Sequence, residues 1–437
     1  MHITACLTAS IMKQSTPPPR DPEREEAGLR AFYSHPEREK LLEFIDTYPH
    51  WDDLIYRKFT SLDPLNLWWY IKGYVRTRKS RVHMGKYDFF FTTPSILFEK
   101  LHKIDTTVGG TLITTGLIPK WEQDRYYLRG LIDESIASSQ IEGAATTKKI
   151  AEQMLRTGRK PKNKDEQMIL NNFSAMQYVG KNSNKDLTKD MLLHLQSLIT
   201  KDTLENTQYT GAWRDTDDIV VADVITGEVY HTPPSHSEIE VLTNDFIDFF
   251  NHQSKEQRFI HPIVRAIILH FLIGWIHPFA DGNGRTARSL FHWYTLKHGY
   301  NLMPYLSISQ MILESKVQYG KAYTQTESDE NDMTYFILYN IKQIEKSWIK
   351  LEQHIQWSLK KEKKLRETYL SEGMNLRQAE ILSWFEKEGD LILTIQDASL
   401  RISTPRPTIR VDIEWLVKLW KLKRIPLNKK TYGYTIP

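Results

Sequence analysis

Residues 277–288 read His277-Pro-Phe-Ala-Asp-Gly-Asn-Gly-Arg-Thr-Ala-Arg288 and join two helical patterns. The run 259–276 before them is apolar, but polar residues such as Arg265 and His270 interrupt it. Because a membrane span needs about 20 consecutive apolar residues, this run predicts a helix buried in a protein core, with His270 as a core histidine. A helical pattern resumes at about Thr286. The polar turn therefore lies between a core helix and the start of a second helix.

The turn has the composition of a phosphate-binding loop. Gly282 and Gly284 flank Asn283, so the backbone can adopt positive φ and direct its N–H groups toward one point. The N-terminus of the following helix adds the positive end of a helix dipole. Asp281 is placed to hold Mg²⁺ against the same phosphates, since such sites use one or two carboxylates plus substrate oxygens.

Three further residues, two arginines and a histidine, complete the chemistry of this segment. Arg285 and Arg288 are three residues apart, so they share a helix face and can make bidentate contacts with phosphate oxygens. His277 can accept a proton from an attacking hydroxyl near neutral pH. Asp-Gly-Asn-Gly alone would be explained as a turn, but a turn does not explain the histidine before it or the arginines after it. We therefore expect a nucleoside triphosphate site.

The segment resembles the signature of the Fic family, His-Pro-Phe-x-Asp/Glu-Gly-Asn-Gly-Arg-x-x-Arg, and matches it at every specified position. Members of this family transfer AMP from ATP to a hydroxyl side chain of a protein, a reaction called AMPylation. The resemblance implies that His277 is the general base, that Asp281 binds Mg²⁺ between the α- and β-phosphates, and that Arg288 holds the γ-phosphate. It implies a core anchor at Phe279. ATP and its phosphates would be bound by Gly282, Asn283, Gly284, Arg285, Thr286, Ala287, Arg288 and, downstream, Tyr319.

A second motif, Ser138-Ser-Gln-Ile-Glu142-Gly143, resembles the family's inhibitory helix. Leu128, Leu131, Ile132 and Ile136 fit one face of a helix over about 128–143, and Gly143 is a typical terminator. An ordinary solvated helix end would have the same composition. With the signature present, the resemblance implies that Glu142, with Ser138, engages Arg288 and keeps the γ-phosphate from its partner.

A third segment, Ile219-Val220-Val221-Ala222 followed by Gly227, predicts a β-hairpin. In the family such a hairpin, the flap, lies beside the base and holds the target's backbone as an added strand. A purely structural hairpin on a helical domain is the alternative.

Composition and charge describe an ordinary globular chain. Hydrophobic content of 40% and charged content of 26% are typical of such proteins, and a net charge of +4 is too small to indicate nucleic-acid binding. The single cysteine, Cys6, excludes internal disulfides and favours a reducing compartment. No basic or apolar segment typical of a signal peptide precedes Cys6. We therefore expect a cytoplasmic protein with no membrane association.

The predicted fold class is mainly α: a Fic-type helical bundle with a β-hairpin flap and a small C-terminal winged helix-turn-helix domain. We expect an extended or disordered segment over 1–28, an N-terminal helical extension over 29–121, a catalytic domain over 122–340, a linker helix over 341–374 and the winged helix over 375–437. In the extension, helical patterns cover 36–48, 51–59 and 65–82, and the basic residues of the last, Lys72 among them, predict a solvated face. The apolar seam of 341–370 suits dimerisation and packing on the bundle equally.

The sequence of the C-terminal domain is compatible with two classes of partner, DNA and protein. Residues 401–437 contain nine Lys/Arg against two acids, which suits phosphate contacts. We expect Trp415, Leu416, Leu419 and Trp420 to be core, leaving Arg406, Thr408, Arg410 and Asp412 for base contacts. A protein-docking or dimerising winged helix would have the same shape without DNA.

The favoured function is an Mg·ATP-dependent protein adenylyltransferase, inhibited by Glu142, with a protein target that includes the enzyme itself. A complete signature favours an enzyme over a DNA-binding regulator with a nucleotide-sensing Fic-like domain, because a sensor does not need His277. A de-AMPylating hydrolase is a third reading that the sequence does not separate from the first.

Overall fold

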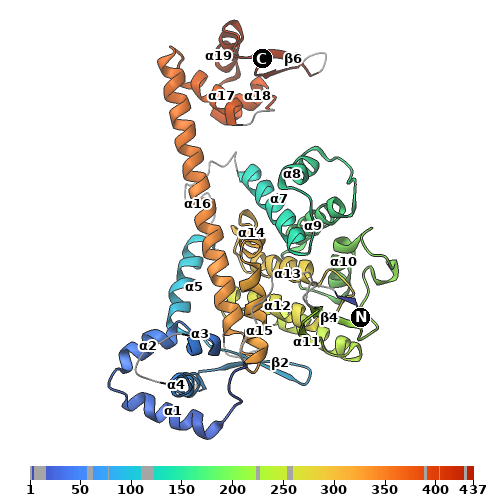
Figure 1. Ribbon diagram of the computed structural model, residues 1–437. Helices are drawn as coiled ribbons and strands as arrows, with labels where there is room; N and C mark the ends of the chain where they lie inside the picture. Colours follow the sequence, from blue (N-terminus) through green and yellow to red (C-terminus); the bar gives the residue numbers. More distant parts are fainter. Residues whose placement is uncertain are drawn as a thin grey trace. The chain divides into compact units, whose positions relative to one another are not determined.

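The computed structural model describes residues 2–3, 16–56, 63–76, 78–109, 123–222, 227–252, 259–387, 391–402, 404–427 and 431–437. Cys6 and the predicted wing residues Lys429 and Lys430 lie outside these ranges. The chain divides into two compact units, Met1–Gly116 with Asp124–Trp348, and Leu117–Gln123 with Ile349–Pro437. Among the described residues, no helix is both long enough and apolar enough to cross a membrane. The architecture is mainly helical with small β-hairpins (Figure 1), as predicted.

The N-terminal part of the first unit contains helices α1 (Pro22–Ser34), α2 (Arg38–Asp46), α3 (Trp51–Tyr56), α4 (Pro64–Arg76) and α5 (Ser95–Thr107). The expected extended segment over 1–28 is wrong at its end, because α1 begins at Pro22. The Asp21 side chain caps this helix by accepting from the N–H groups of Glu23 and Arg24.

The helical pattern expected over 65–82 ends at Arg76, and an antiparallel hairpin follows, β2 (Ser80–Met84) with β3 (Tyr87–Phe91). A two-residue turn at Gly85, with φ of 56°, connects the strands. Phe89 on β3 packs edge-on against Trp275 in the bundle, with ring centroids 4.9 Å apart. The hairpin thus braces the end of the helix that precedes the signature.

The expected solvated face of α4 is wrong at Lys72. This side chain is buried and pairs with the buried carboxylate of Asp329, which also accepts a hydrogen bond from the hydroxyl of Tyr335. A neighbouring carboxylate, Asp332, accepts from the hydroxyl of Tyr48 at 2.6 Å. Buried charges require such partners, so α4 is attached to the segment between α15 and α16 by polar contacts as well as by its aromatic side.

The helical bundle of the first unit comprises α7 (Gln123–Ile141), α8 (Lys148–Thr157), α9 (Lys164–Asn182), α10 (Lys189–Thr200), α11 (Ile239–Asn251), α12 (Pro262–Ile276), α13 (Asn283–Lys297), α14 (Ile308–Leu313) and α15 (Lys316–Ser328). Short 3₁₀ turns lie at Thr207–Tyr209, His236–Glu238 and Met303–Tyr305. The central helix α12 is buried along nearly its whole length, as its apolar run predicts. Leu128, expected on the apolar face of α7, is instead exposed.

The flap is a hairpin of β4 (Ile219–Ala222) and β5 (Val229–His231). The strand β1 (His2–Ile3) pairs in parallel with the outer edge of β4, which gives the sheet the order β1-β4-β5. One edge of the flap is therefore already engaged by the chain's own backbone.

The long helix α16 (Thr334–Ser371) begins seven residues before the expected linker helix and crosses the boundary between the two units. The second unit continues with α17 (Leu376–Lys387), α18 (Ile395–Ile402), α19 (Arg406–Lys418), β6 (Lys423–Pro426) and β7 (Tyr432–Thr435). The two strands form an antiparallel hairpin, and β7 also bridges to Leu393. Three helices followed by a hairpin is the predicted element order.

The core of the second unit differs from the expected one. Leu416 is buried together with Trp384, Ile409, Ile413 and Tyr434. Trp415, Leu419 and Trp420 were expected to be core but are 36%, 45% and 85% exposed. The expectation for Asp412 is also wrong, because its buried carboxylate accepts from Asn375, Arg377 and Gln378.

Candidate active site

The signature begins where α12 ends. The N–H of His277 donates to the carbonyl of Ile273 at 3.0 Å, and His277 then adopts the left-handed conformation with φ of 50°. A non-glycine residue in this region is a strained backbone position of the kind that collects at functional sites. The turn lifts the imidazole off the helix axis and into a cleft.

The loop closes at the first residue of α13. Gly282 has a φ of 87°, which is the positive φ that the sequence predicts. Gly284 does not have it, because α13 begins at Asn283 rather than at about Thr286. A Cβ at Gly284 would overlap the Glu142 carboxylate in its present position and lie 3.1 Å from an Arg288 nitrogen.

Asn283 holds the loop in shape. Its side chain accepts from the N–H of Phe279 at 3.0 Å and donates to the carbonyl of the same residue at 2.8 Å. The Phe279 ring is fully buried and lies 4.9 Å from the ring of Trp213. The predicted anchoring role of Phe279 thus has a structural basis, and Asn283 acts on the loop through its side chain.

His277 is buried, and its tautomer follows from one contact. Nδ1 lies 3.1 Å from the carbonyl oxygen of Gly274, and a carbonyl can only accept, so Nδ1 carries the hydrogen. In the neutral ring Nε2 then has the lone pair. Burial lowers the pKa of His277 to about 4, with a smaller opposing effect from the Gly274 carbonyl. The imidazole is therefore neutral and able to take a proton at ordinary pH.

Arg214, which the sequence analysis did not single out as a site residue, ties the loop to the flap. Its buried guanidinium donates to the carbonyls of His277, at 2.9 Å, and of Thr216 and Pro234. It also pairs with Asp217 at 3.1 Å. Burial lowers the pKa of Arg214, partly offset by Asp217. One side chain thus connects the two ends of the flap segment to the backbone of the predicted base.

The remaining signature residues divide between the cleft and the core. Asp281 lines the cleft, and its Oδ1 accepts from the N–H of Gly282 and from Arg285 at 3.1 Å. Arg285, Thr286 and Ala287 are buried and do not line the cleft. Arg285 donates to the carbonyl of Ile199 at 3.2 Å, so its guanidinium lies behind Asp281. The part of the turn that lines the cleft is instead Gly282, Asn283 and Gly284.

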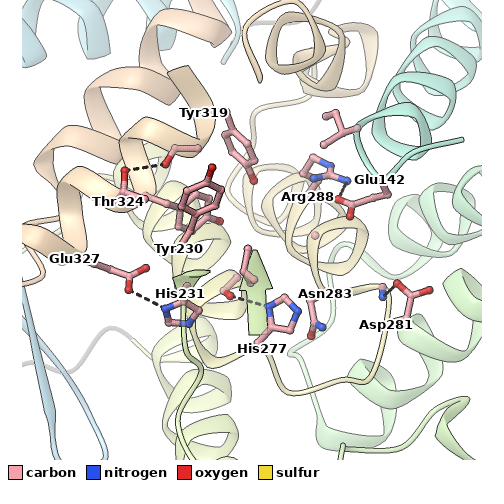
Figure 2. Close-up of a pocket in the computed structure, with 17 residues that line it drawn as sticks. Glu142, Tyr230, His231, His277, Asp281, Asn283, Arg288, Tyr319, Thr324 and Glu327 are labelled. Atoms are coloured by element: carbon pink, nitrogen blue, oxygen red, sulfur yellow. Dashed lines mark hydrogen bonds and ion pairs between the residues drawn. The ribbon is translucent and has the colours of Figure 1, made fainter. Parts of the chain in front are cut away.

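Arg288 and Glu142 form the predicted pair. The Arg288 guanidinium donates to Glu142 Oε1 at 2.8 Å (Figure 2). It also donates to Ser138 Oγ at 2.8 Å and to the Ser138 carbonyl at 2.9 Å. The two side chains are 4% and 16% exposed, so solvent screens the pair little. Glu142 holds the pKa of Arg288 above its ordinary value against the effect of burial. Ser138 and Glu142 therefore occupy the hydrogen-bonding face of Arg288 together.

Glu134, on α7, extends this group of contacts deeper into the bundle. Glu134 precedes Ser138 by one helical turn, is fully buried, and accepts from the N–H of Ser309 at 3.0 Å. Its carboxylate lies 3.4 Å from Nε2 of His292 on α13, one turn after Arg288. The spacing of four between Glu134, Ser138 and Glu142 was visible in the sequence, but only the packing of α7 on α13 gives it meaning.

The cleft encloses about 840 Å³ of empty space, part of it open to solvent. His277, Asp281 and the N-terminus of α13 form one wall, and Glu142 with Arg288 forms its end. Flap residues Val221, Tyr230 and His231 face them. Of the other predicted flap residues, Ile219 and Ala222 are buried and Val220 is half-buried.

Helix α15 supplies the last wall, with Tyr319, Tyr323, Thr324 and Glu327. The hydroxyl of Tyr319 lies 2.8 Å from Nε2 of His270, which is the buried core histidine that the sequence predicts. Tyr319 is thus placed in the cleft as expected. Tyr230 belongs to the predicted hairpin and Tyr323 lies near Tyr319, but neither was predicted as a site residue. His231, Thr324 and Glu327 were not predicted, because no sequence motif includes them.

Comparison with known proteins agrees with this geometry. Residues 186–295 match the model of the Fic/DOC family, so the chain contains a Fic/DOC domain. A protein adenylyltransferase Fic of Aedes aegypti is 32% identical over 137 residues, which cover 30% of this chain and 25% of that protein. The corresponding protein of Nematostella vectensis is 40% identical over 70 residues, or 16% of each chain. The matches thus span a quarter or less of these relatives.

The fold has a solved counterpart. The structure of Fic-1 (residues 134–508) from C. elegans aligns with a TM-score of 0.50 at 18% identity, covering 77% of this chain and 90% of that one. This likeness shows a Fic-type fold.

Proposed function

We propose that this chain is a protein adenylyltransferase that transfers AMP from Mg·ATP to a hydroxyl side chain of a protein. The observation that carries the proposal is the orientation of His277. Its ring donates through Nδ1 to Gly274, so the neutral tautomer carries its lone pair on Nε2, beside the N-terminus of α13. A neutral base next to an anion-binding helix end suits attack of a hydroxyl on a phosphate. The named relatives, which are protein adenylyltransferases, support the same reaction.

In this reaction the hydroxyl oxygen of the target forms a bond to the α-phosphorus of ATP. The bond between the α-phosphorus and the α,β-bridging oxygen breaks, and pyrophosphate leaves. The hydroxyl proton passes to Nε2 of His277. The amides of the first turn of α13, where no side-chain cap is present, would hold the phosphates. The AMP group ends on the target as a phosphodiester.

The residues present fit a magnesium ion that the substrate helps to bind. Among the described residues no group of three His, Cys, Asp or Glu side chains could hold a metal ion. Mg²⁺ commonly takes one carboxylate and completes its sphere with phosphate oxygens and water. Asp281 provides a carboxylate at the cleft wall, with both of its hydrogen bonds on Oδ1. When bound there, Mg²⁺ would neutralise phosphate charge, while Arg285 holds the carboxylate in place.

Glu142 would inhibit this reaction by competing for Arg288. The guanidinium that we assign to the γ-phosphate is already bound to Glu142 and Ser138. ATP would then bind with its phosphates displaced relative to the target hydroxyl, and a small displacement lowers the rate by orders of magnitude. Tyr319, in the same cleft, is our candidate for a contact with the nucleotide.

Incubation with α-labelled ATP tests the proposal. Label is expected on protein with Glu142→Gly, much less with the wild type, and none with the double variant Glu142→Gly/His277→Ala. Protein labelled by Glu142→Gly is then repurified and given wild-type enzyme. Loss of label would favour removal of AMP as the wild-type activity, and failure to label any protein, including the enzyme itself, would refute the transfer reaction.

We further propose that the second unit is a winged helix that docks to protein rather than DNA. Four apolar side chains are exposed on α19 or directly after it: Val411 and Trp415 on the helix, Leu419 at its C-cap, and Trp420. A helix that reads base edges needs polar side chains there, and Asp412 is buried in a structural network. Binding of the full chain to a randomised duplex library, with a steep decrease of affinity at higher salt, would contradict this assignment.

A further inference from the structure

The cleft contains a histidine that makes two hydrogen bonds to acceptors on two different helices. Nε2 of His231, on flap strand β5, lies 2.7 Å from the carbonyl oxygen of Trp275, near the end of α12. Nδ1 lies 2.8 Å from Oε2 of Glu327 on α15 (Figure 2). The two contacts join the flap to the helix that carries His277 and to the wall opposite.

These two contacts determine how many protons His231 and Glu327 must hold together. The Trp275 carbonyl can only accept, so Nε2 of His231 carries a hydrogen. The hydrogen bond to Glu327 then needs a second proton, either on Nδ1 of an imidazolium or on the carboxyl group of Glu327. Without that proton, the lone pair of Nδ1 faces the lone pairs of an ionised carboxylate and the bond is lost. The bridge thus exists only while the pair holds its extra proton.

The burial of His231 increases the cost of losing its hydrogen bond to Glu327. The side chain of His231 is 9% exposed, so water replaces a lost bond poorly. The other titratable groups that line the cleft with it are Tyr230 on its own strand, Tyr319 and Tyr323 on α15, and Glu142, His277, Asp281 and Arg288 across the cleft. Among the residues that the structure describes, Glu327 is the carboxylate within hydrogen-bonding distance of His231.

We propose that the proton shared by His231 and Glu327 docks the flap onto the catalytic helices, and that its loss as the pH rises frees the flap and weakens binding of the protein acceptor. Both are positioning residues, since neither touches the reacting atoms. The inference rests on the proposed adenylyltransferase function, in which the flap holds the acceptor backbone as an added strand. The charge of His231 also acts on the base, because it is one of the influences that lower the pKa of His277.

One substitution separates the proton from the bridge. In Glu327→Gln the amide nitrogen can donate to Nδ1 of a neutral His231, while Nε2–H still donates to Trp275. The bridge is then complete at every pH. In His231→Phe it is absent at every pH. His252→Gln is the matched control, because His252 forms a similar pair with Asp248 but is exposed on α11, away from the cleft.

Amide hydrogen exchange of the flap provides a readout that does not depend on catalysis. Between about pH 5 and about pH 8, protection of the strands β4 and β5 in the wild type is expected to fall roughly tenfold or more, the effect of one charge-assisted hydrogen bond. Protection should stay high in Glu327→Gln, stay low in His231→Phe, and follow the wild type in His252→Gln. Protection factors, corrected for the intrinsic pH dependence of exchange, are compared.

Kinetics in the Glu142→Gly background then link the flap to the acceptor. Over the same pH range KM for the acceptor protein should rise in the parent and stay constant with Glu327→Gln, while kcat changes little because His277 is neutral throughout. Flap protection that does not respond to pH, or that responds equally in Glu327→Gln, would overturn the inference even if AMP transfer occurs. Absence of AMP transfer with a normal exchange pattern would instead overturn the proposed function.

Discussion

Replacing Glu142 with glycine should convert Arg288 into a selective partner of the γ-phosphate. The contact to be lost is a charge-assisted hydrogen bond of 2.8 Å between side chains that are largely shielded from water. Such a bond contributes about 1.5–3 kcal/mol, and each 1.4 kcal/mol is about tenfold in affinity. Removing the competing carboxylate is thus expected to strengthen the γ-phosphate contact about 10- to 100-fold. Glu142 follows the last residue of α7, so the substitution leaves that helix intact.

Calorimetry with Mg·ATP and Mg·ADP isolates this effect, because ADP has no γ-phosphate. In the wild type the two nucleotides should bind with similar Kd. In Glu142→Gly the preference for ATP should rise by the factor above, and Arg288→Ala in the same background should abolish it. Glu152→Ala, which removes a half-buried carboxylate on α8 that pairs with Arg156, is the control. An unchanged preference in Glu142→Gly, with Arg288 present, would refute competition between the carboxylate and the γ-phosphate.

Three further predictions concern the base, the metal and the second unit. His277→Ala should lower the rate of AMP transfer about 10²–10⁴-fold in the Glu142→Gly background without changing Kd for ATP. Because burial lowers the pKa of His277 to about 4, transfer should lose its base only as the pH falls through about 4. Because this pKa lies below the ordinary value of 6.5, the neutral ring stabilises the folded state above pH 6.5, and this contribution is lost as the pH falls toward 4. The free energy of unfolding, measured in urea, should therefore decrease less over this range in His277→Ala than in the wild type. Asp281→Ala should abolish the Mg²⁺ dependence of ATP binding measured by calorimetry. Asp412→Ala should destabilise the second unit by about 1–3 kcal/mol, because Arg377, Asn375 and Gln378 lose their acceptor, as chemical denaturation followed by tryptophan fluorescence would report.

Local sequence could predict those parts of the site that depend on neighbouring residues. The end of α12, the turn at Gly282 and the grouping of His277 with Asp281 all arise within one short segment. The reason for Gly284 could not be predicted in the same way. Positive φ is the usual cause of a glycine in such a turn, but Gly284 lies in helical backbone, and its close neighbour is the carboxylate of Glu142, which lies far away in the sequence.

Periodicity predicted helix faces better than it predicted what covers them. Trp415, Leu419 and Trp420 are apolar and close in sequence, which favoured a core position, yet they are exposed while Leu416 is buried. A helical pattern shows which residues share a face and leaves open whether another element packs on it. The β2–β3 hairpin was missed for a related reason, because its aromatic residues were read as part of a helical region.

Contacts between segments that are far apart in the chain could not be predicted from the sequence. His231 and Glu327 are 96 residues apart, and Arg214 and His277 are 63 apart. Neither His231 nor Arg214 belongs to a motif, and a lone histidine or arginine in a loop has many ordinary explanations. Only the packing of the flap against α12 and α15 brings them together.

The guanidinium of Arg214 has a consequence for how such an enzyme can change over evolution. It binds the backbone at both ends of the flap segment, Thr216 and Pro234, and the backbone of His277 as well. Under the proposed function, insertions, deletions and substitutions between those two ends would alter which protein strand is accepted, while the base keeps its place. Acceptor specificity would then diversify at little risk to the chemistry, as long as this one arginine is retained.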